Sequence, residues 1–318
     1  MACYGRVKQA AIWIERRSSR LSGIIEPVVL RSAGGEGQTP TTSSLGAKSR
    51  SIEINDEPSK DSAPVVRHII EGLAAAGTDK KRASAERVGI PMGKAFGVSV
   101  AVVREMAKRY KGRSELADPL WATGYHEARL LAILLADPKA ISRAQLEVWL
   151  GDVVSWDLCH HLCTDLVRRR PDALALAKRW IKSTKLYVRR AAFSTIAACA
   201  VHDKTLGDEA LEAVLNLIVE HAEDPRPHVR QAASWAIRPV GKRNTKCMRL
   251  AKCAAERLVK SNEDGGVWVG KDALCELNTL VSVAARDRLL TSKSGTARKE
   301  RKHTYGRAYQ AGNVGKET

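Results

Sequence analysis

The hydrophobic pattern of the chain changes near Pro64. After this point, stretches of roughly 12 to 18 residues carry apolar side chains at the spacing of amphipathic helices. Asp-Pro steps, glycines and short polar turns separate the stretches, and almost none of them alternates as a strand does. The pattern therefore predicts an all-α chain.

The predicted helices continue almost to the C-terminus. They cover residues 64–76, 79–88, 99–111, 116–136, 141–153, 155–169, 172–183, 186–201, 208–223, 227–240, 246–260 and 267–290. Breaks at ADPK near 137, RRRPD at 168–172 and EDPRP at 223–227 divide them into units of about 35 to 45 residues. Such helix pairs predict an α-solenoid of HEAT-like repeats, with a compact helical bundle as the alternative.

The two ends of the chain lack this periodicity. Residues 1–62 are rich in Ser, Gly and Thr and are expected to form a disordered or weakly ordered leader, with at most a short helix at 9–17. A transit peptide is disfavoured because the leader contains acidic residues. Residues 63–290 then form the helical domain, and residues 291–318 a disordered basic tail.

Charge indicates the kind of partner. The chain has 53 Lys and Arg against 35 Asp and Glu, a net charge of +18, which favours a polyanion. The densest basic segment of the body is 168–193, which includes Lys185, Arg189 and Arg190 and fits a phosphate-binding track better than a solvated helix rim.

Cysteines and hydropathy indicate the compartment. Seven cysteines without a secretory signal predict reduced thiols and a cytoplasmic protein. No apolar run approaches the roughly 18 residues that a membrane helix needs. We expect a monomer without a cofactor.

The segment SWDLCHHLC, residues 155–163, combines several reactive side chains on one helix. Helical spacing places Trp156 beside His160 and Asp157 beside His161. A zinc site is a weak alternative, because Cys159 and its neighbours do not provide the four ligands of a structural site. We therefore expect no bound metal. Further along, Trp235 lies among small residues, which either leaves room for a partner or marks a core tryptophan.

Four segments carry a resemblance to a known family. These are LWATGYHEARLLA (120–132), SWDLCHHLC (155–163), YVRRAAF (187–193) and VRQAASWAIRPVGKRN (229–244). Over about 64–260, the chain resembles the AlkD-like DNA alkylation repair family. The resemblance implies a HEAT-like fold with a concave basic cleft, and a DNA glycosylase that hydrolyses the N-glycosidic bond of cationic N3- or N7-alkylpurines in duplex DNA.

The resemblance also implies roles for individual residues. Trp156 and Trp235 match the two tryptophans of the family's active cleft, and Arg190 matches its phosphate-binding arginine. The family's essential aspartate follows the first tryptophan by one helical turn, and here His160 stands in that place. Lys185, Arg189 and Arg238 are expected to add DNA contacts.

The exchange of aspartate for His160 weakens the expected chemistry. A carboxylate stabilises the oxocarbenium charge that develops as the glycosidic bond breaks, and a neutral imidazole does not. Loss of one charge pair predicts a rate about a hundredfold to a thousandfold lower. Asp157, or a water held by His160, are the possible substitutes. The alternative function is a noncatalytic HEAT-like scaffold that binds branched DNA, RNA or a protein; the location expected for the repair function is cytoplasmic, on the nucleoid.

Overall fold

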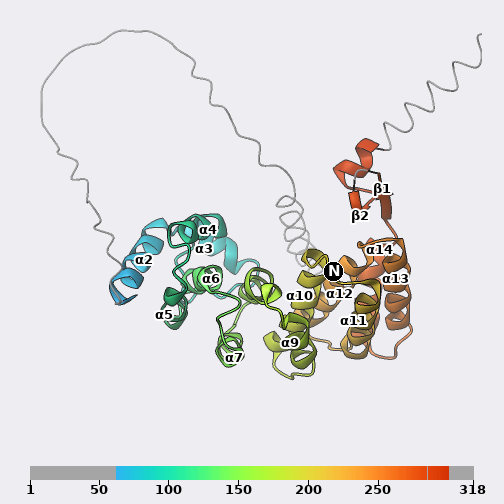
Figure 1. Cartoon of the computed structure of the whole chain (residues 1–318), viewed down its shortest axis with the longest axis horizontal. Coiled ribbons are helices and arrows are strands. Elements are labelled where there is room, and N and C mark those ends of the chain that lie inside the picture. The colour runs from blue at the N-terminus through green and yellow to red at the C-terminus, as the bar shows by residue number, and fades with distance from the viewer. Residues whose placement is uncertain (1–61, 285, 301–318) are drawn as a thin grey trace, which may run out of the picture. The chain divides into compact units, whose positions relative to one another are not determined.

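The computed structural model of the chain describes residues 62–284 and 286–300. The predicted leader with its short helix at 9–17, and the tail beyond residue 300, lie outside the described residues. The described part is built mainly from helices, so the all-α prediction is confirmed (Figure 1).

The first half of the described chain contains helices α2 to α7. Their bounds are Ser62–Ala76 (α2), Asp79–Glu86 (α3), Val100–Arg109 (α4), Ser114–Leu116 (η1), Ala117–Ala122 (α5), His126–Leu135 (α6) and Arg143–Gly151 (α7). The single helix predicted over 116–136 is therefore wrong. Gly124 interrupts it with a φ of 75°, a conformation that glycine adopts readily and helices exclude.

Buried Glu127 fixes the approach to α4. Its carboxylate accepts the backbone N–H groups of Phe96, Gly97 and Val98 at 2.8–3.0 Å. These three donors precede α4 and would otherwise be buried without partners. Glu127 thus ties the segment before α4 to the start of α6, against which α4 and α5 both pack.

The second half contains α8 to α14. The bounds are Trp156–His161 (α8), Leu162–Leu166 (η2), Val167–Arg169 (η3), Ala173–Trp180 (α9), Leu186–His202 (α10), Asp208–His221 (α11), Pro227–Gly241 (α12), Thr245–Val259 (α13) and Asp264–Leu277 (α14). Helix α10 packs against α9 and α12, and α14 packs against α12 and α13. The predicted helix over 155–169 is helical throughout but irregular, because η2 is a π-helical segment.

A β-hairpin replaces the end of the last predicted helix. Strands β1 (Leu280–Val283) and β2 (Arg286–Thr291) pair antiparallel, so the prediction of a helix over 267–290 is wrong beyond residue 277. The guanidinium of Arg288 donates to the carbonyls of Val201 and Pro239 at 3.1 and 3.0 Å, which fixes the hairpin to the ends of α10 and α12. Residues 295–300 are helical, so ordered structure continues past the predicted domain boundary at 290.

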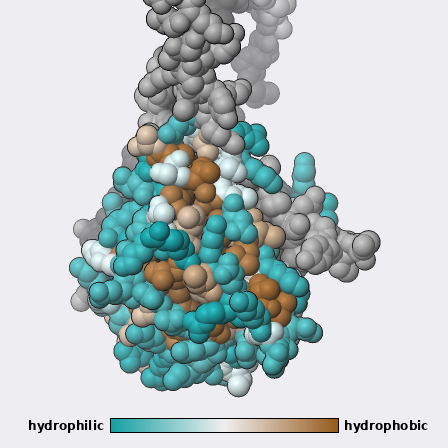
Figure 2. Space-filling model, turned by 90° about the vertical axis from the view of Figure 1, so that its right-hand side faces the viewer, coloured by the Kyte–Doolittle hydropathy of each residue, from teal (hydrophilic) through white to brown (hydrophobic). Residues whose placement is uncertain are grey.

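The core follows the apolar faces of the helices. Trp149 and Phe193 are among its largest fully buried side chains, and the ring of Trp149 stacks on that of Trp121 with 4.4 Å between centroids. The face in Figure 2 is largely hydrophilic, with separate apolar patches. Within the part of the chain that is described, no helix is both long and apolar enough to cross a bilayer.

Candidate functional site

Trp156 begins α8 and is largely enclosed. Trp156 is 8% exposed, and its indole Nε1 donates a hydrogen bond to the carbonyl of Val88 at 3.0 Å. Val88 belongs to the turn that follows α3, where Gly89 has a φ of 78°. A turn 68 residues upstream therefore covers the indole, which the sequence spacing gave no way to foresee.

Asp157 forms an ion pair with His126, the first residue of α6. The distance from His126 Nε2 to Asp157 Oδ2 is 2.9 Å, and both side chains are 13% exposed. Burial would raise the pKa of Asp157, but hydrogen bonding to His126 and its charge outweigh burial and lower the pKa to about 2. Burial lowers the pKa of His126, yet the bond to Asp157 raises it overall. Asp157 is thus ionised at neutral pH and held by a partner.

His161, which helical spacing placed beside Asp157, hydrogen-bonds to a different carboxylate. Its Nδ1 lies 2.7 Å from Asp165 Oδ2, and Arg104 reaches the same carboxylate at 2.9 Å. Burial opposes ionisation of Asp165, but His161 and Arg104 lower its pKa to about 2. This triad joins α4 to η2.

His160 is partly exposed and lies against Trp235. Their ring centroids are 5.2 Å apart with a 47° angle between the planes, and the centroid of the His161 ring lies 5.6 Å from that of His160. Burial, followed by the charges of His161 and Arg190, lowers the pKa of His160 to about 3. The imidazole is therefore neutral at physiological pH.

Trp235 is partly buried in the middle of α12. Its neighbours Ala232, Ala233 and Ala236 are fully buried, so the small residues pack into the core while the indole reaches His160. The structure thus brings together two of the predicted residues, from segments 75 positions apart along the sequence in α8 and α12.

Arg190 lies on α10 and is only 5% exposed. Its guanidinium donates to the backbone carbonyl of His228, and its Nε has no hydrogen-bond partner among the described residues. The rings of His228 and Tyr187 are 6.2 Å apart. The sequence assigned neither residue a role, although Tyr187 begins the YVRRAAF segment that carries the resemblance.

The three other predicted DNA contacts differ in their availability. Arg189 lies 3.4 Å from Asp224, and Arg238 lies 3.2 Å from Glu276, so both are engaged in ion pairs within the fold. Lys185 stands exposed at the N-cap of α10. Of the three, Lys185 is the one presented to solvent.

The cysteines of the SWDLCHHLC segment pack against α10. The thiol of Cys159 donates to the carbonyl of Tyr187 at 3.6 Å, and the thiol of Cys163 to that of Ala191 at 3.5 Å. Among the residues described, no group of three or more His, Cys, Asp or Glu side chains could hold a metal ion. These contacts favour a packing role for the two thiols over the zinc alternative.

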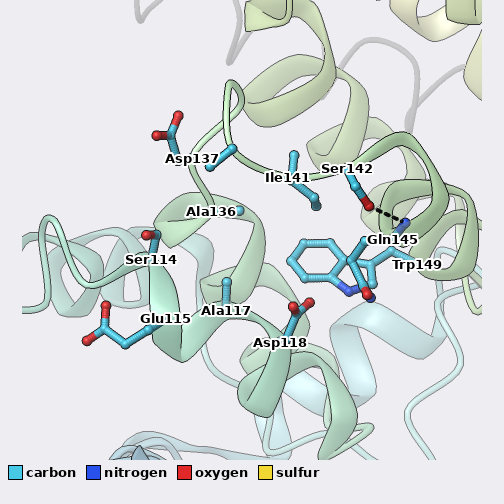
Figure 3. A pocket seen from close by; sticks show the side chains of 11 residues that line it. Ser114, Glu115, Ala117, Asp118, Ala136, Asp137, Ile141, Ser142, Gln145 and Trp149 are labelled. Carbon is cyan, nitrogen blue, oxygen red and sulfur yellow. Dashed lines mark hydrogen bonds between the residues drawn. The ribbon is translucent and has the colours of Figure 1, made fainter. Parts of the chain in front are cut away.

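A separate pocket of about 390 Å³ lies between η1, α5 and α7, and Figure 3 shows its lining. Glu115, Asp118 and Asp137 contribute carboxylates to it, and none of the predicted site residues lines it. A polyanion would be repelled by this lining. The pocket is therefore not part of the candidate nucleic-acid site.

Comparisons with known proteins decide the family. Residues 69–251 match the sequence profile of a family described as "DNA alkylation repair enzyme". The chain belongs to this family. All eight predicted site residues lie within the matched range, and the β-hairpin lies outside it. No curated protein matches the chain.

A solved structure similar to this DNA alkylation repair family member identifies its fold, and a second similar structure is a weaker match. One belongs to "a new family of proteins related to the HEAT-like repeat DNA glycosylases with affinity for branched DNA structures"; it is 20% identical, with a TM-score of 0.56 over 74% of this chain and 93% of that chain. A designed armadillo repeat protein in complex with a (KR)4 peptide is 15% identical, with a TM-score of 0.31 over 67% and 91%. The first likeness confirms the HEAT-like fold; the concave basic cleft stays a prediction.

Proposed function

We propose that this DNA alkylation repair family member binds duplex DNA and excises alkylated bases weakly or not at all. The observation that carries the proposal is the neutral ring of His160 against Trp235, in the position where the resemblance implies a catalytic carboxylate. A cationic lesion and a developing oxocarbenium ion both need a negative charge there.

Exposed cations near the site support DNA binding. Arg87 precedes Val88, the residue that accepts the hydrogen bond of Trp156. The backbone carbonyl of Lys94 accepts a hydrogen bond from the backbone N–H of His126 at 2.8 Å, and the side chain of Lys94 is exposed. Together with Lys185, these side chains can contact phosphates irrespective of base sequence.

The carboxylates near His160 support weak excision. Asp157 and Asp165 are the two whose charges act on His160, and they pair with His126 and with His161 and Arg104. Both carboxylates are thus held by partners within the fold. A missing charge of this kind lowers the rate by about a hundredfold to a thousandfold.

A specific observation favours residual glycosylase activity as a second candidate. Asp157 is ionised, and its Oδ1 has no hydrogen-bond partner in the described structure. If α8 shifts when DNA binds, this oxygen could stabilise the sugar cation in place of the missing aspartate. The labile glycosidic bond of 7-methylguanine is the substrate on which such activity would be detected first.

Release of 7-methylguanine from methylated duplex DNA separates these candidates. We expect little release by the wild type and a gain of about a hundredfold in His160→Asp. Release by the wild type that disappears in Asp157→Asn would establish the second candidate. Wild-type release at the rate of His160→Asp would refute weak excision.

A salt titration tests the DNA binding itself. Phosphate contacts predict that the affinity for duplex DNA falls steeply with salt. A four-way junction is the informative competitor, because the similar solved protein has affinity for branched DNA. If only a large excess of the four-way junction displaces the duplex, the result favours duplex binding. If a small amount of junction displaces the duplex, the result favours the noncatalytic scaffold. No binding to either DNA in dilute salt would refute the proposal.

A further inference from the structure

The pocket between η1, α5 and α7 contains negative charge that the fold neutralises only in part. Asp118 and Asp137 line it, and both residues are exposed. Neither carboxylate forms an ion pair within the described residues, and Asp137 Oδ1 accepts only the backbone N–H of Lys139, at 2.9 Å. The third carboxylate, Glu115, pairs with Arg113 at 2.7 Å. Two of the three charges are therefore available to a ligand.

A buried indole faces the same pocket without a hydrogen-bond partner. Trp149 is 1% exposed, and its indole nitrogen lies toward the side-chain ends of Asp118 and Gln145 (Figure 3). Trp121, on which Trp149 stacks, donates its Nε1 to Asp152 at 2.9 Å. The Nε1 of Trp149 makes no hydrogen bond to a described residue. Because a buried indole N–H normally has an acceptor, this donor indicates a ligand that supplies one.

The walls of the pocket are fixed by other contacts. Arg170 donates to the carbonyls of Pro138 and Ile141, which holds the segment that follows Asp137. The hydroxyl of Ser142 caps α7 by accepting a backbone N–H at 3.1 Å (Figure 3). The volume of about 390 Å³ lies within the range of roughly 300–1,000 Å³ that is typical of small-ligand sites. A site built in advance loses little conformational entropy on binding.

The arrangement of the donors and acceptors indicates the kind of cation. A metal ion needs several ligands in one coordination sphere, and no three His, Cys, Asp or Glu side chains of the described part of the chain could provide it. The indole N–H of Trp149 is a donor and cannot coordinate a metal. An ammonium or guanidinium group has several N–H donors that can reach carboxylates lying apart. The pocket therefore fits an organic cation that also carries an acceptor.

We propose that this pocket binds an arginine or lysine residue of a peptide segment. The cationic side chain pairs with Asp118 and Asp137, and a peptide carbonyl accepts the indole N–H of Trp149. A basic peptide supplies both the cation and the uncharged acceptor, which a simple amine does not. None of the predicted DNA-binding residues lines the pocket, so the inference goes beyond the proposed function and does not depend on it.

Titration of the full chain with Nα-acetylarginine N-methylamide tests this inference. Two-dimensional NMR follows the indole N–H signals of the seven tryptophans, and the signal that shifts should be the one that Trp149→Phe removes. Nα-acetylcitrulline N-methylamide, the uncharged isostere, should bind about tenfold more weakly because it forms no charge-assisted hydrogen bonds. Equal binding of the two compounds, or no shift of the Trp149 signal, would overturn the inference.

Agmatine separates a peptide from a free amine. It keeps the guanidinium group but has no carbonyl to accept the indole N–H, so it should bind more weakly and leave the Trp149 signal almost in place. If agmatine binds as tightly as the arginine derivative and shifts the signal equally, the pocket is a site for free cations and the assignment to a peptide is wrong.

A matched pair of variants tests the role of the carboxylates. Asp118→Asn should weaken binding of the arginine derivative about fivefold. Asp264→Asn changes another exposed aspartate in the first turn of a helix, far along the chain in α14, and should leave the affinity unchanged. Equal effects would contradict the proposed site. Both residues are exposed, so the test does not depend on whether Trp149→Phe folds.

The outcomes for the two proposals are distinguishable. Asp118→Asn should bind duplex DNA as the wild type does, because Asp118 is not among the candidate DNA contacts. If duplex binding fails while the arginine derivative still shifts the Trp149 signal, the proposed DNA binding is wrong and the peptide site stands. If duplex binds and the derivative does not, only the peptide site is wrong.

Discussion

Trp156 and Trp235 lie on helices that both pack against α10, but their surroundings differ. The indole of Trp156 is enclosed by the Val88 turn and donates a hydrogen bond to it, and the adjacent Asp157 pairs with His126. Trp235 is partly exposed, and its ring meets the uncharged ring of His160.

The difference separates a tryptophan that stabilises the fold from one that a ligand can reach. The resemblance implied the same role for both, because each matches a tryptophan of the family's active cleft. The enclosed region of Trp156 joins α3, α6 and α8 through specific hydrogen bonds, so its side chains stabilise the fold. Trp235 is only partly buried, so part of its ring is open to a ligand.

Replacing the two tryptophans should have unequal effects on stability. We expect Trp156→Ala to lower the free energy of unfolding by about 3 kcal/mol, because it empties a buried site and leaves Val88 without its donor. Trp235→Ala should cost about 1 kcal/mol, since less apolar surface is buried. Urea unfolding followed by circular dichroism measures both. Equal losses would remove the structural distinction.

The ion pair next to Trp156 should make the stability of the enclosed region depend on pH. The pKa of Asp157 is lowered from 3.8 to about 2, so its stabilising contribution is present above pH 4 and is lost as the pH falls through 2. We expect the stability difference between wild type and Asp157→Asn to shrink by about 2 kcal/mol between pH 5 and pH 2. A difference that stays constant over this range would contradict the assignment.

The stabilising contribution of His126 should depend on pH in the opposite direction. Its pKa is raised above 6.5, so its contribution is complete below pH 6.5 and is lost as the pH rises through the folded-state value. His126→Gln, which keeps a hydrogen-bond donor without the titration, should show no such loss in the same unfolding measurement.

DNA binding should depend on the open region. Trp235→Ala should weaken duplex binding about tenfold, because stacking of one base on an indole contributes roughly 1–3 kcal/mol. Trp156→Phe keeps the enclosed ring and should change the affinity less than about twofold. Anisotropy titrations at one salt concentration compare the variants. A larger loss in Trp156→Phe would reverse the roles given to the two tryptophans.

The sequence predicted the helices and the family better than the environment of each site residue. Periodicity located the regular helices, but it could not show the break at Gly124 or the hairpin after residue 277, because these depend on one backbone conformation and on docking by Arg288. The enclosure of Trp156 depends on Val88, 68 positions away, and spacing within one helix reports no such contact.

The sequence also could not show which charged residues near the site have partners. The sequence identified Lys185 and Arg238 alike as DNA contacts, because composition reports charge without its partners. In the fold, Arg238 pairs with Glu276, which also pairs with Lys242. Lys185 is exposed, and no ion pair engages it within the described residues.

The salt dependence of DNA binding should distinguish Lys185 from Arg238. The expected change is smaller than those expected for the tryptophan and ion-pair variants. If Lys185 neutralises one phosphate, Lys185→Gln should reduce the slope of log affinity against log salt by about 1 and weaken binding equally for different sequences. Arg238→Gln removes a cation of the same charge that is held by Glu276, so the slope should stay unchanged. Equal changes in slope would mean that Arg238 leaves Glu276 when DNA binds, and that the open region extends along α12 beyond Trp235.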